Sequence, residues 1–327
     1  MTVPWTPLVT LDFMNSTATS EGAWSTGATF RVPRRKVKED DPMSRQMRTY
    51  YYAILGAIGG LIGWQVSNLL GLSFVTNLYL SEAIVGALIG LLIGLFIGIT
   101  EGLLTLNFVQ ALKSGLFGAA LGMVAGGIGL PLSEFLFQAV GAGPFGRALG
   151  WAIFGLLLGL AEGIVGKSQV WKGALGGFIG GALGGLLLEG AHNWLQDPVT
   201  GKAAGLILMG AAVGAFISLI VVLLSKAWLE VTSGKLKGTE FILDKFMRKG
   251  GPAVAIGSSP LKSEIVLPDP DIAPQHAMLT GDGMSFSLKD MSLAGTYING
   301  KKIQLTHLSD GQKIRMGNTE MVYHEKR

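Results

Sequence analysis

The chain has 327 residues, of which 49% are hydrophobic and only 15% charged, and it contains 49 glycines and no cysteine. The lack of cysteine excludes a disulfide framework, a zinc–thiolate site and a cysteine nucleophile. A net charge of +4, scattered along the sequence, does not indicate a nucleic-acid partner. Residues 51–225 hold 36 of the glycines but only 11 acidic or basic side chains. This distribution predicts a membrane domain between two aqueous segments.

Six apolar stretches have about the length of 20 residues that a helix needs to cross a bilayer. They lie at about 51–72, 84–104, 108–130, 148–165, 170–188 and 203–224. Hydropathy separates neighbouring spans poorly, so counts of five and seven stay open. Lys and Arg gather before the first span, after the last, and in the turns after spans two and four, which places both termini in the cytoplasm. The sequence therefore predicts a multi-pass, all-α bundle in the lipid bilayer.

Glycines recur at helical spacing in these spans. The pattern of Gly56, Gly59 and Gly63 in the first span returns in the third and the fifth. The matching glycines are Gly115, Gly118 and Gly122, and then Gly177, Gly180 and Gly184. Small residues at this spacing let helix backbones approach one another in lipid. The pattern predicts three tandem helical hairpins of parallel topology, with a period of roughly 60 residues.

Two acidic residues occupy equivalent positions in the membrane domain. Glu101 and Glu162 lie at the cytoplasmic ends of the second and fourth spans. Charged groups at membrane depth indicate a functional site, which keeps a pore or transport path open as a hypothesis. A solvated or paired carboxylate at a helix end is the simpler interpretation, and it leaves the bundle as a compact anchor.

The predicted domains are a flexible cytoplasmic tail at 1–49, a transmembrane helical domain at 50–226 and a β-sandwich at 227–327. The tail mixes Ser, Thr, Pro and charge, which favours mobility. After position 227, short strand-like runs alternate with Gly, Pro, Asp and Asn, as in a β-sandwich. The runs are 228–231, 240–243, 253–256, 264–267, 277–279, 285–288 and 296–298. Asn299 and Gly300 then predict a two-residue hairpin turn.

An ordered series of motifs over about 100 residues resembles a forkhead-associated (FHA) domain. The series consists of 229–238, Gly257 with the strand at 265–267, His276, the segment 290–300, and closing strands at 308–311 and 314–317. The resemblance implies a β-sandwich that binds phosphothreonine peptides through loops at one end. It also implies a loop framework formed by Gly257, His276, Gly295, Asn299 and Gly300.

The peptide-binding loops implied by this resemblance depart from the family's pattern. Ser258 stands in place of the family's arginine and Ala273 in place of its serine, while Leu293 and Ala294 stand where Thr and Asn are usual. Ser259 and Ser292 keep hydroxyls at matching positions, and the glycine loop inserts Lys262, a candidate for the missing cation. Each lost charge-assisted hydrogen bond costs about 1.5–3 kcal/mol. Docking of a partner without a phosphate is therefore an alternative to phosphothreonine recognition.

The sequence contains no recognisable catalytic constellation. Its four histidines are far apart, and neither a nucleotide-binding loop nor a hydrolase or kinase signature is present. We expect no enzymatic activity, no cofactor and no metal. The leading hypothesis is a membrane-anchored adaptor or signalling protein whose cytoplasmic FHA-like domain binds a protein partner. Alternatives are a transporter or channel with a regulatory FHA-like domain, and a subunit of a larger membrane complex; the glycine faces also fit an oligomer.

Overall fold

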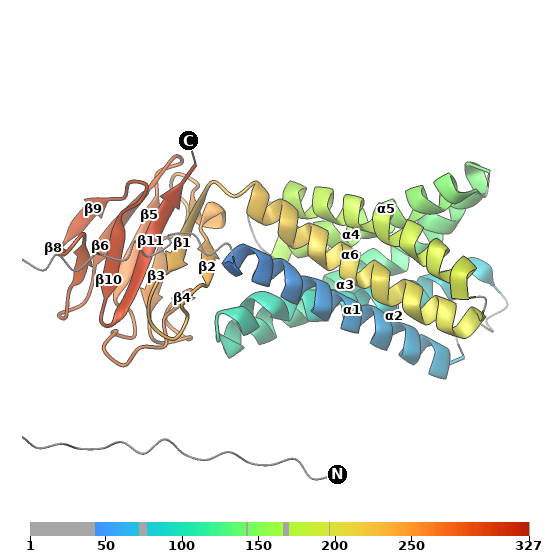
Figure 1. Ribbon diagram of the computed structural model, residues 1–327, viewed down its shortest axis with the longest axis horizontal. Coiled ribbons are helices and arrows are strands. Elements are labelled where there is room, and N and C mark those ends of the chain that lie inside the picture. The colour runs from blue at the N-terminus through green and yellow to red at the C-terminus, as the bar shows by residue number, and fades with distance from the viewer. Residues whose placement is uncertain (1–42, 72–76, 142, 166–169, 196, 327) are drawn as a thin grey trace, which may run out of the picture. The chain divides into compact units, whose positions relative to one another are not determined.

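The computed structural model describes residues 43–71, 77–141, 143–165, 170–195 and 197–326. Within these ranges six α-helices precede 11 β-strands, and a short 3-10 helix, η2(Asp244–Phe246), follows the second strand (Figure 1). Most of the predicted tail lies outside the described residues. Helix α1 begins at Met43, ahead of both the predicted end of the tail and the predicted start of the first span.

The helical part consists of α1(Met43–Leu69), α2(Leu78–Leu104), α3(Phe108–Ala139), α4(Pro144–Val165), α5(Val170–Leu195) and α6(Pro198–Leu223). Helices α2 to α6 are long and apolar enough to cross a membrane, and among the described residues α1 is not one of them. Helix α1 is less apolar because it carries tyrosines at positions 50–52 together with Trp64 and Gln65. Six helices are therefore present where six were predicted, and five of them meet the requirements of a span.

Helix α3 differs most from its predicted bounds. The predicted apolar stretch ended at about Leu130, but the helix continues through Pro131 to Ala139 and has 32 residues. Proline removes one backbone hydrogen bond, and membrane helices tolerate it where neighbouring groups compensate. At the other end, the turn from α2 is tight, and the side chain of Asn107 caps α3 by accepting the backbone N–H of Gln110 at 3.0 Å.

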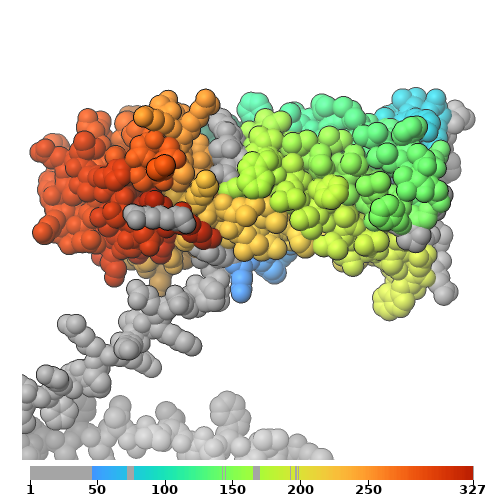
Figure 2. All heavy atoms as spheres, turned by 90° about the horizontal axis from the view of Figure 1, so that it is seen from above, coloured from blue at the N-terminus to red at the C-terminus, as the bar shows by residue number. Residues whose placement is uncertain are grey.

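The helices approach one another most closely at glycines. A Cβ atom on Gly90 of α2 would overlap the carbonyl oxygen of Gly122 of α3. The same overlap would occur for Gly155 of α4 against α5, and for Gly56 of α1 against α6. Figure 2 shows one face of the helical part, where the side chains of α4 and α5 (green) and α6 (yellow) lie against one another. These contacts gain dispersion energy that would be lost if a larger side chain separated the backbones.

The centre of the helical part is filled with side chains. Ile93 of α2, Phe154 of α4 and Met209 of α6 are fully buried in one apolar cluster. Ile97, Leu158 and Val213, each one turn further along the same three helices, belong to the same cluster. These side chains occupy the space between the three helices.

The strands form two sheets of a β-sandwich. The first has the order β2-β1-β11-β10-β7-β8 and the second β4-β3-β5-β6-β9. The strands are β1(Ala227–Val231), β2(Glu240–Ile242), β3(Val254–Gly257), β4(Ile265–Val266), β5(Ala277–Gly281), β6(Phe286–Asp290), β7(Thr296–Ile298), β8(Lys301–Ile303), β9(Leu305–His307), β10(Lys313–Met316) and β11(Thr319–Glu325). Apolar side chains from both sheets are fully buried between them, among them Leu229, Ile256, Leu279, Phe286 and Tyr323.

All seven predicted strand-like runs correspond to β1–β7, but one closing motif was wrong. Residues 308–311 form a turn between β9 and β10, where Gly311 has a φ of +78°. Only Leu308 of this motif is buried, and the Ser-Asp-Gly that follows is typical of a turn. Strands β8, β9 and β11 carry no signal that the prediction used.

Candidate functional site

Hydrogen bonds join the β3–β4 loop (258–264) to the β4–β5 loop (267–276). The backbone N–H of Ser258 donates to the carbonyl of Ala273 at 3.0 Å, and the Ser258 hydroxyl donates to the carbonyl of Ile272 at 2.7 Å. A Cβ atom on Gly257 would overlap the carbonyl oxygen of Pro274. Glycine is therefore required for these loops to meet, and the Ser258 proton is already used inside the protein.

His276 connects the β4–β5 loop to the β6–β7 loop (291–295). The side chain is fully buried, and Nδ1 accepts the backbone N–H of Ala273 at 3.1 Å. The proton must then lie on Nε2, which donates to the carbonyl of Gly295 at 3.3 Å. Both ring nitrogens are thus occupied, so His276 supports the loops and has no nitrogen left for a ligand.

Asp269 fixes the β4–β5 loop from its other side. Its carboxylate accepts the backbone N–H of Asn318 at 2.9 Å and the hydroxyl of Thr319 at 3.0 Å. Burial acts to raise the pKa of Asp269, but hydrogen bonds from Asp271, Asn318 and Thr319 outweigh it and leave the pKa lowered. The ionised carboxylate therefore ties this loop to the turn between β10 and β11.

The predicted turn at Asn299 and Gly300 joins β7 and β8, which pair antiparallel. Both residues have positive φ values, +49° and +81°, as a two-residue hairpin turn requires. The Asn299 side chain accepts the backbone N–H of Lys313 at 3.1 Å, and its backbone N–H donates to the Lys313 carbonyl at 2.9 Å. Asn299 therefore holds the hairpin against β10.

Replacing Asn299 with alanine should destabilise the full-length protein by about 1–2 kcal/mol, because alanine is disfavoured at positive φ. Asn299→Gly, which also loses the side-chain bond to Lys313 but tolerates the backbone conformation, should cost less. Thermal unfolding of the two variants measures the difference. Equal melting temperatures for Asn299→Ala and the unaltered protein would contradict a framework role.

The β6–β7 loop presents the clearest hydrogen-bond donor. The hydroxyl oxygen of Ser292 accepts the backbone N–H of Ala294 at 3.1 Å, which leaves the hydroxyl proton able to donate outwards. Leu293 between them is completely exposed. Asp290 orders the loop by accepting the Thr296 hydroxyl at 2.9 Å. Ser292 thus offers a donor that Ser258 does not.

A cation that no sequence motif indicates lies next to this loop. The ammonium group of Lys302, on β8, donates to the carbonyl of Leu293 at 3.5 Å, and the side chain passes beside Gly295. The two-residue turn at Asn299 and Gly300 fixes the register of the hairpin, which pairs Lys302 with Tyr297. This register, rather than a motif, is the sequence signal that indicates Lys302. Lys262, the cation that was selected, is exposed on the β3–β4 loop and lines a groove against α3.

Glu101 and Glu162 both line a cavity of about 70 Å³ at the end of the helices next to η2. The Glu101 carboxylate lies 3.4 Å from the ammonium of Lys245 and 4.0 Å from the guanidinium of Arg48. One carboxylate oxygen of Glu162 is buried, and within the described residues it has no hydrogen-bond partner. Among the residues that the structure describes, no three His, Asp or Glu side chains form a group that could hold a metal ion.

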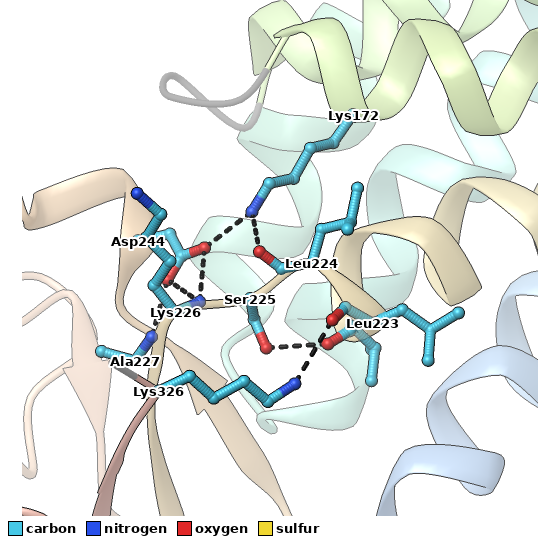
Figure 3. Close-up of polar contacts among 9 residues, drawn as sticks. Lys172, Leu223, Leu224, Ser225, Lys226, Ala227, Asp244 and Lys326 are labelled. Atoms are coloured by element: carbon cyan, nitrogen blue, oxygen red, sulfur yellow. Dashed lines mark hydrogen bonds and ion pairs between the residues drawn. The ribbon is translucent and has the colours of Figure 1, made fainter.

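A buried ion pair that no sequence motif indicates links α5 to η2 (Figure 3). The Lys172 ammonium lies 2.9 Å from the Asp244 carboxylate and also donates to the carbonyl of Leu224. Their side chains are 4% and 2% exposed. Asp244 also accepts the backbone N–H groups of Lys226 and Ala227, at 2.8 Å and 2.9 Å. One carboxylate therefore joins a helix, the α6–β1 link and the sandwich.

Comparison with known proteins identifies the sandwich. The family model of the FHA domain matches residues 254–317. The glycogen accumulation regulator GarA of Mycolicibacterium smegmatis is 31% identical over 98 residues, which are 30% of this chain and 58% of that protein. An oxoglutarate dehydrogenase inhibitor of Corynebacterium diphtheriae is 32% identical over 98 residues, or 30% of this chain and 64% of the inhibitor. The chain thus spans about three fifths of the length of these curated relatives.

Among solved structures, the FHA domain of the CT664 protein from Chlamydia trachomatis is 30% identical, covering 32% of this chain and 100% of that chain with a TM-score of 0.28. The family match and the two curated relatives agree with the motifs of the sandwich. Residues 254–317 are an FHA domain. The family match does not extend to the helices.

Proposed function

We propose that this chain is a membrane-anchored adaptor whose FHA domain binds a protein partner at the cytoplasmic face. The observation that carries the proposal is the joining of an FHA domain to five helices of membrane-spanning length in one chain. The two curated relatives are named as a regulator and an inhibitor, which supports a binding role without catalysis here.

The chemistry of the helices supports membrane insertion. Large apolar side chains are exposed on the outside of the helices, including Leu116 and Phe117 of α3. Such a surface is unfavourable in water and favourable against lipid. The Lys and Arg residues near the span ends support a topology with both termini in the cytoplasm. The FHA loops then face cytoplasmic proteins.

The group that the loops recognise is a phosphothreonine of the partner. A phosphate needs donors and a cation. Ser292 supplies a hydroxyl proton, Ser259 supplies a second hydroxyl, and Lys302 supplies the charge that Ser258 cannot. Ala273, Leu293 and Ala294 contribute surface without a side-chain donor. This arrangement predicts phosphate-dependent but modest affinity.

The proposal is tested by titrating the full-length protein, in nanodiscs, with matched peptides that contain either phosphothreonine or threonine. Lys302→Ala and Ser292→Ala should each weaken binding of the phosphorylated peptide by about tenfold or more, because each removes a charge-assisted hydrogen bond. Lys289→Ala, an exposed lysine on β6, is the matched control and should leave the affinity unchanged.

The same titration separates the alternatives. Equal binding of both peptides would contradict phosphate recognition and support phosphate-independent docking. The proposed adaptor function would remain. If a broad peptide library gives no binding of either form, the loops are not the partner site. Loss of affinity in Lys289→Ala as large as in Lys302→Ala would remove the specific role of Lys302.

The transporter alternative depends on Glu101 and Glu162. Both lie at one end of the helices, whereas the centre is filled by Ile93, Phe154 and Met209. This packing favours an anchor over a continuous path. Solute or ion flux in liposomes that disappears in Glu101→Ala and Glu162→Ala would reverse the preference.

A further inference from the structure

A groove of about 500 Å³ lies between the first turns of α3 and the β3–β4 loop of the FHA domain. Its helical wall includes Val109, Lys113 and Phe117, and its loop wall consists of residues 260–264. It is separate from the Ser292 and Lys302 side of the loops, because neither residue lines it. Its occupant must therefore be inferred from its own chemistry.

The groove carries unbalanced positive charge from both walls. Lys113 and Lys262 line it, and in the described part of the chain neither has an acidic partner within 4.0 Å. A third lysine, Lys245, pairs with Glu101. The single carboxylate of the walls, Glu264, accepts the backbone N–H of Ala255 at 2.8 Å. Two free ammonium groups across a groove complement a phosphate.

The groove is apolar where Phe117 and Leu121 line it, and exposed apolar side chains continue from there along α3. Phe117 lines the groove and belongs to a stripe of exposed apolar side chains on one side of the helix. Helical spacing places Val124, Ile128 and Phe135 on the same side as Phe117, and all four are exposed. The groove therefore has a cationic part next to an apolar part. These parts complement an amphiphilic ligand, which has an anionic group attached to an apolar chain.

The length and the polar first turns of α3 fit a groove at the level of the lipid headgroups. The helix has 32 residues. At 1.5 Å per residue it extends about 48 Å, whereas the hydrocarbon core of a bilayer is about 30 Å thick. The helix is therefore longer than the core, and the polar side chains of Gln110, Lys113 and Ser114 in its first turns favour the headgroup region for this end. Lysine side chains at this level commonly reach towards phosphate groups.

We propose that this groove binds an anionic glycerophospholipid, with the headgroup phosphate between Lys113 and Lys262 and an acyl chain along Phe117. The inference rests on the membrane insertion proposed above. A phosphopeptide would match the two ammonium groups but would leave the apolar stripe without a partner. A lipid satisfies both, and it places the β3–β4 loop of the FHA domain in direct contact with the membrane.

The test titrates the full-length protein, in a neutral detergent, with phosphatidylglycerol or phosphatidylcholine and counts bound lipids by native mass spectrometry. Phosphatidylglycerol should bind more tightly. Lys113→Gln and Lys262→Gln should each weaken its binding about fivefold, and the double variant about 25-fold. Lys237→Gln, an exposed lysine outside the groove, is the control and should bind normally. Hydrogen exchange of residues 259–264 should slow when phosphatidylglycerol binds to the unaltered protein.

Two further titrations identify the kind of ligand that supplies the bound phosphate. Glycerol phosphate, which has no acyl chains, should bind far more weakly than the lipid; equal affinity would overturn the proposal. A phosphothreonine peptide should not displace the bound lipid, and competition dependent on Lys113 would instead assign the groove to peptides. Equal binding of the two lipids, or normal binding by the double variant, would also overturn it.

Alkaline carbonate extraction of membranes separates this result from the proposed membrane location. If the protein stays in the membrane but binds the two lipids equally, only the proposed lipid site is contradicted. Protein released by carbonate would remove the membrane anchor and, with it, this inference. The thermal stability of Lys113→Gln and Lys262→Gln should match that of Lys237→Gln, so that lost binding is not lost folding.

Discussion

Replacing Lys172 with alanine is expected to destabilise the full-length protein by about 3–5 kcal/mol. The substitution removes the ammonium group that lies 2.9 Å from the carboxylate of Asp244, which is 2% exposed. The hydrogen bonds from the backbone N–H groups of Lys226 and Ala227 do not replace that positive charge. Breaking a buried pair from one side costs more than the pair itself contributes, because the remaining charge stays desolvated.

The effect should be concentrated at the α6–β1 link. Lys172 also donates to the Leu224 carbonyl, so its loss frees this link as well as Asp244. Trypsin cleavage after Lys226 and thermal unfolding in nanodiscs measure the two consequences. Lys202→Ala, at an exposed lysine of α6, is the matched control. Unchanged cleavage and melting in Lys172→Ala would show that the pair does not hold the link.

A double variant tests the physical reason. Lys172→Met combined with Asp244→Asn removes both charges, and it should be more stable than Lys172→Ala alone because neither charge of the pair remains buried. A double variant that is less stable than Lys172→Ala would indicate that the Asp244 hydrogen bonds to the backbone matter more than its charge.

Replacing Gly90 with leucine should prevent α2 and α3 from packing. A Cβ atom at this position would overlap the Gly122 carbonyl oxygen and lie 2.9 Å from the Cα of Gly126. Backbone atoms cannot move aside as the end of a flexible side chain can. We expect a loss of at least about 3 kcal/mol, at the upper end for an overpacked core.

The measurement is the yield of monodisperse protein after solubilisation, followed by its thermal unfolding. Gly90→Ala should give an intermediate result, because it adds only the Cβ atom. Gly190→Leu is the control: Gly190 lies in α5, and a Cβ atom there would meet nothing within 4 Å. Equal yields for the Gly90 and Gly190 leucine variants would contradict close helix contact at Gly90.

Local signals made much of this fold predictable. The hairpin turn at Asn299 and Gly300 was predicted because two adjacent residues determine it, and the seven runs up to β7 were predicted because each has its own apolar core residues. Strand β8 was not, because Lys301 and Lys302 give it an exposed, charged sequence. The predicted span at 108–130 ended before α3 does, because hydropathy marks the apolar part of a helix and the residues after Leu130 include Pro131, Ser133 and Glu134.

Contacts between distant segments could not be predicted in this way. Lys172 and Asp244 are 72 residues apart, and neither has a sequence context that marks a partner. Glu101 was selected as a conspicuous charge, but its partners Arg48 and Lys245 come from different parts of the chain. Lys302 was overlooked because its position beside the binding loops depends on the register of the β7–β8 hairpin and on the path of the β6–β7 loop.

Only three residues, 224–226, separate α6 from β1, and side chains hold them at both ends. Lys172 bonds to Leu224, Asp244 to the backbone of Lys226, and Lys326 to the carbonyl of Leu223 at 3.3 Å (Figure 3). The FHA domain therefore has no flexible tether to α6. If the chain is the membrane-anchored adaptor proposed above, its partner must itself reach the loops, through a long unstructured segment or by diffusing along the same bilayer. A force on the bound peptide would then pass directly into the helices.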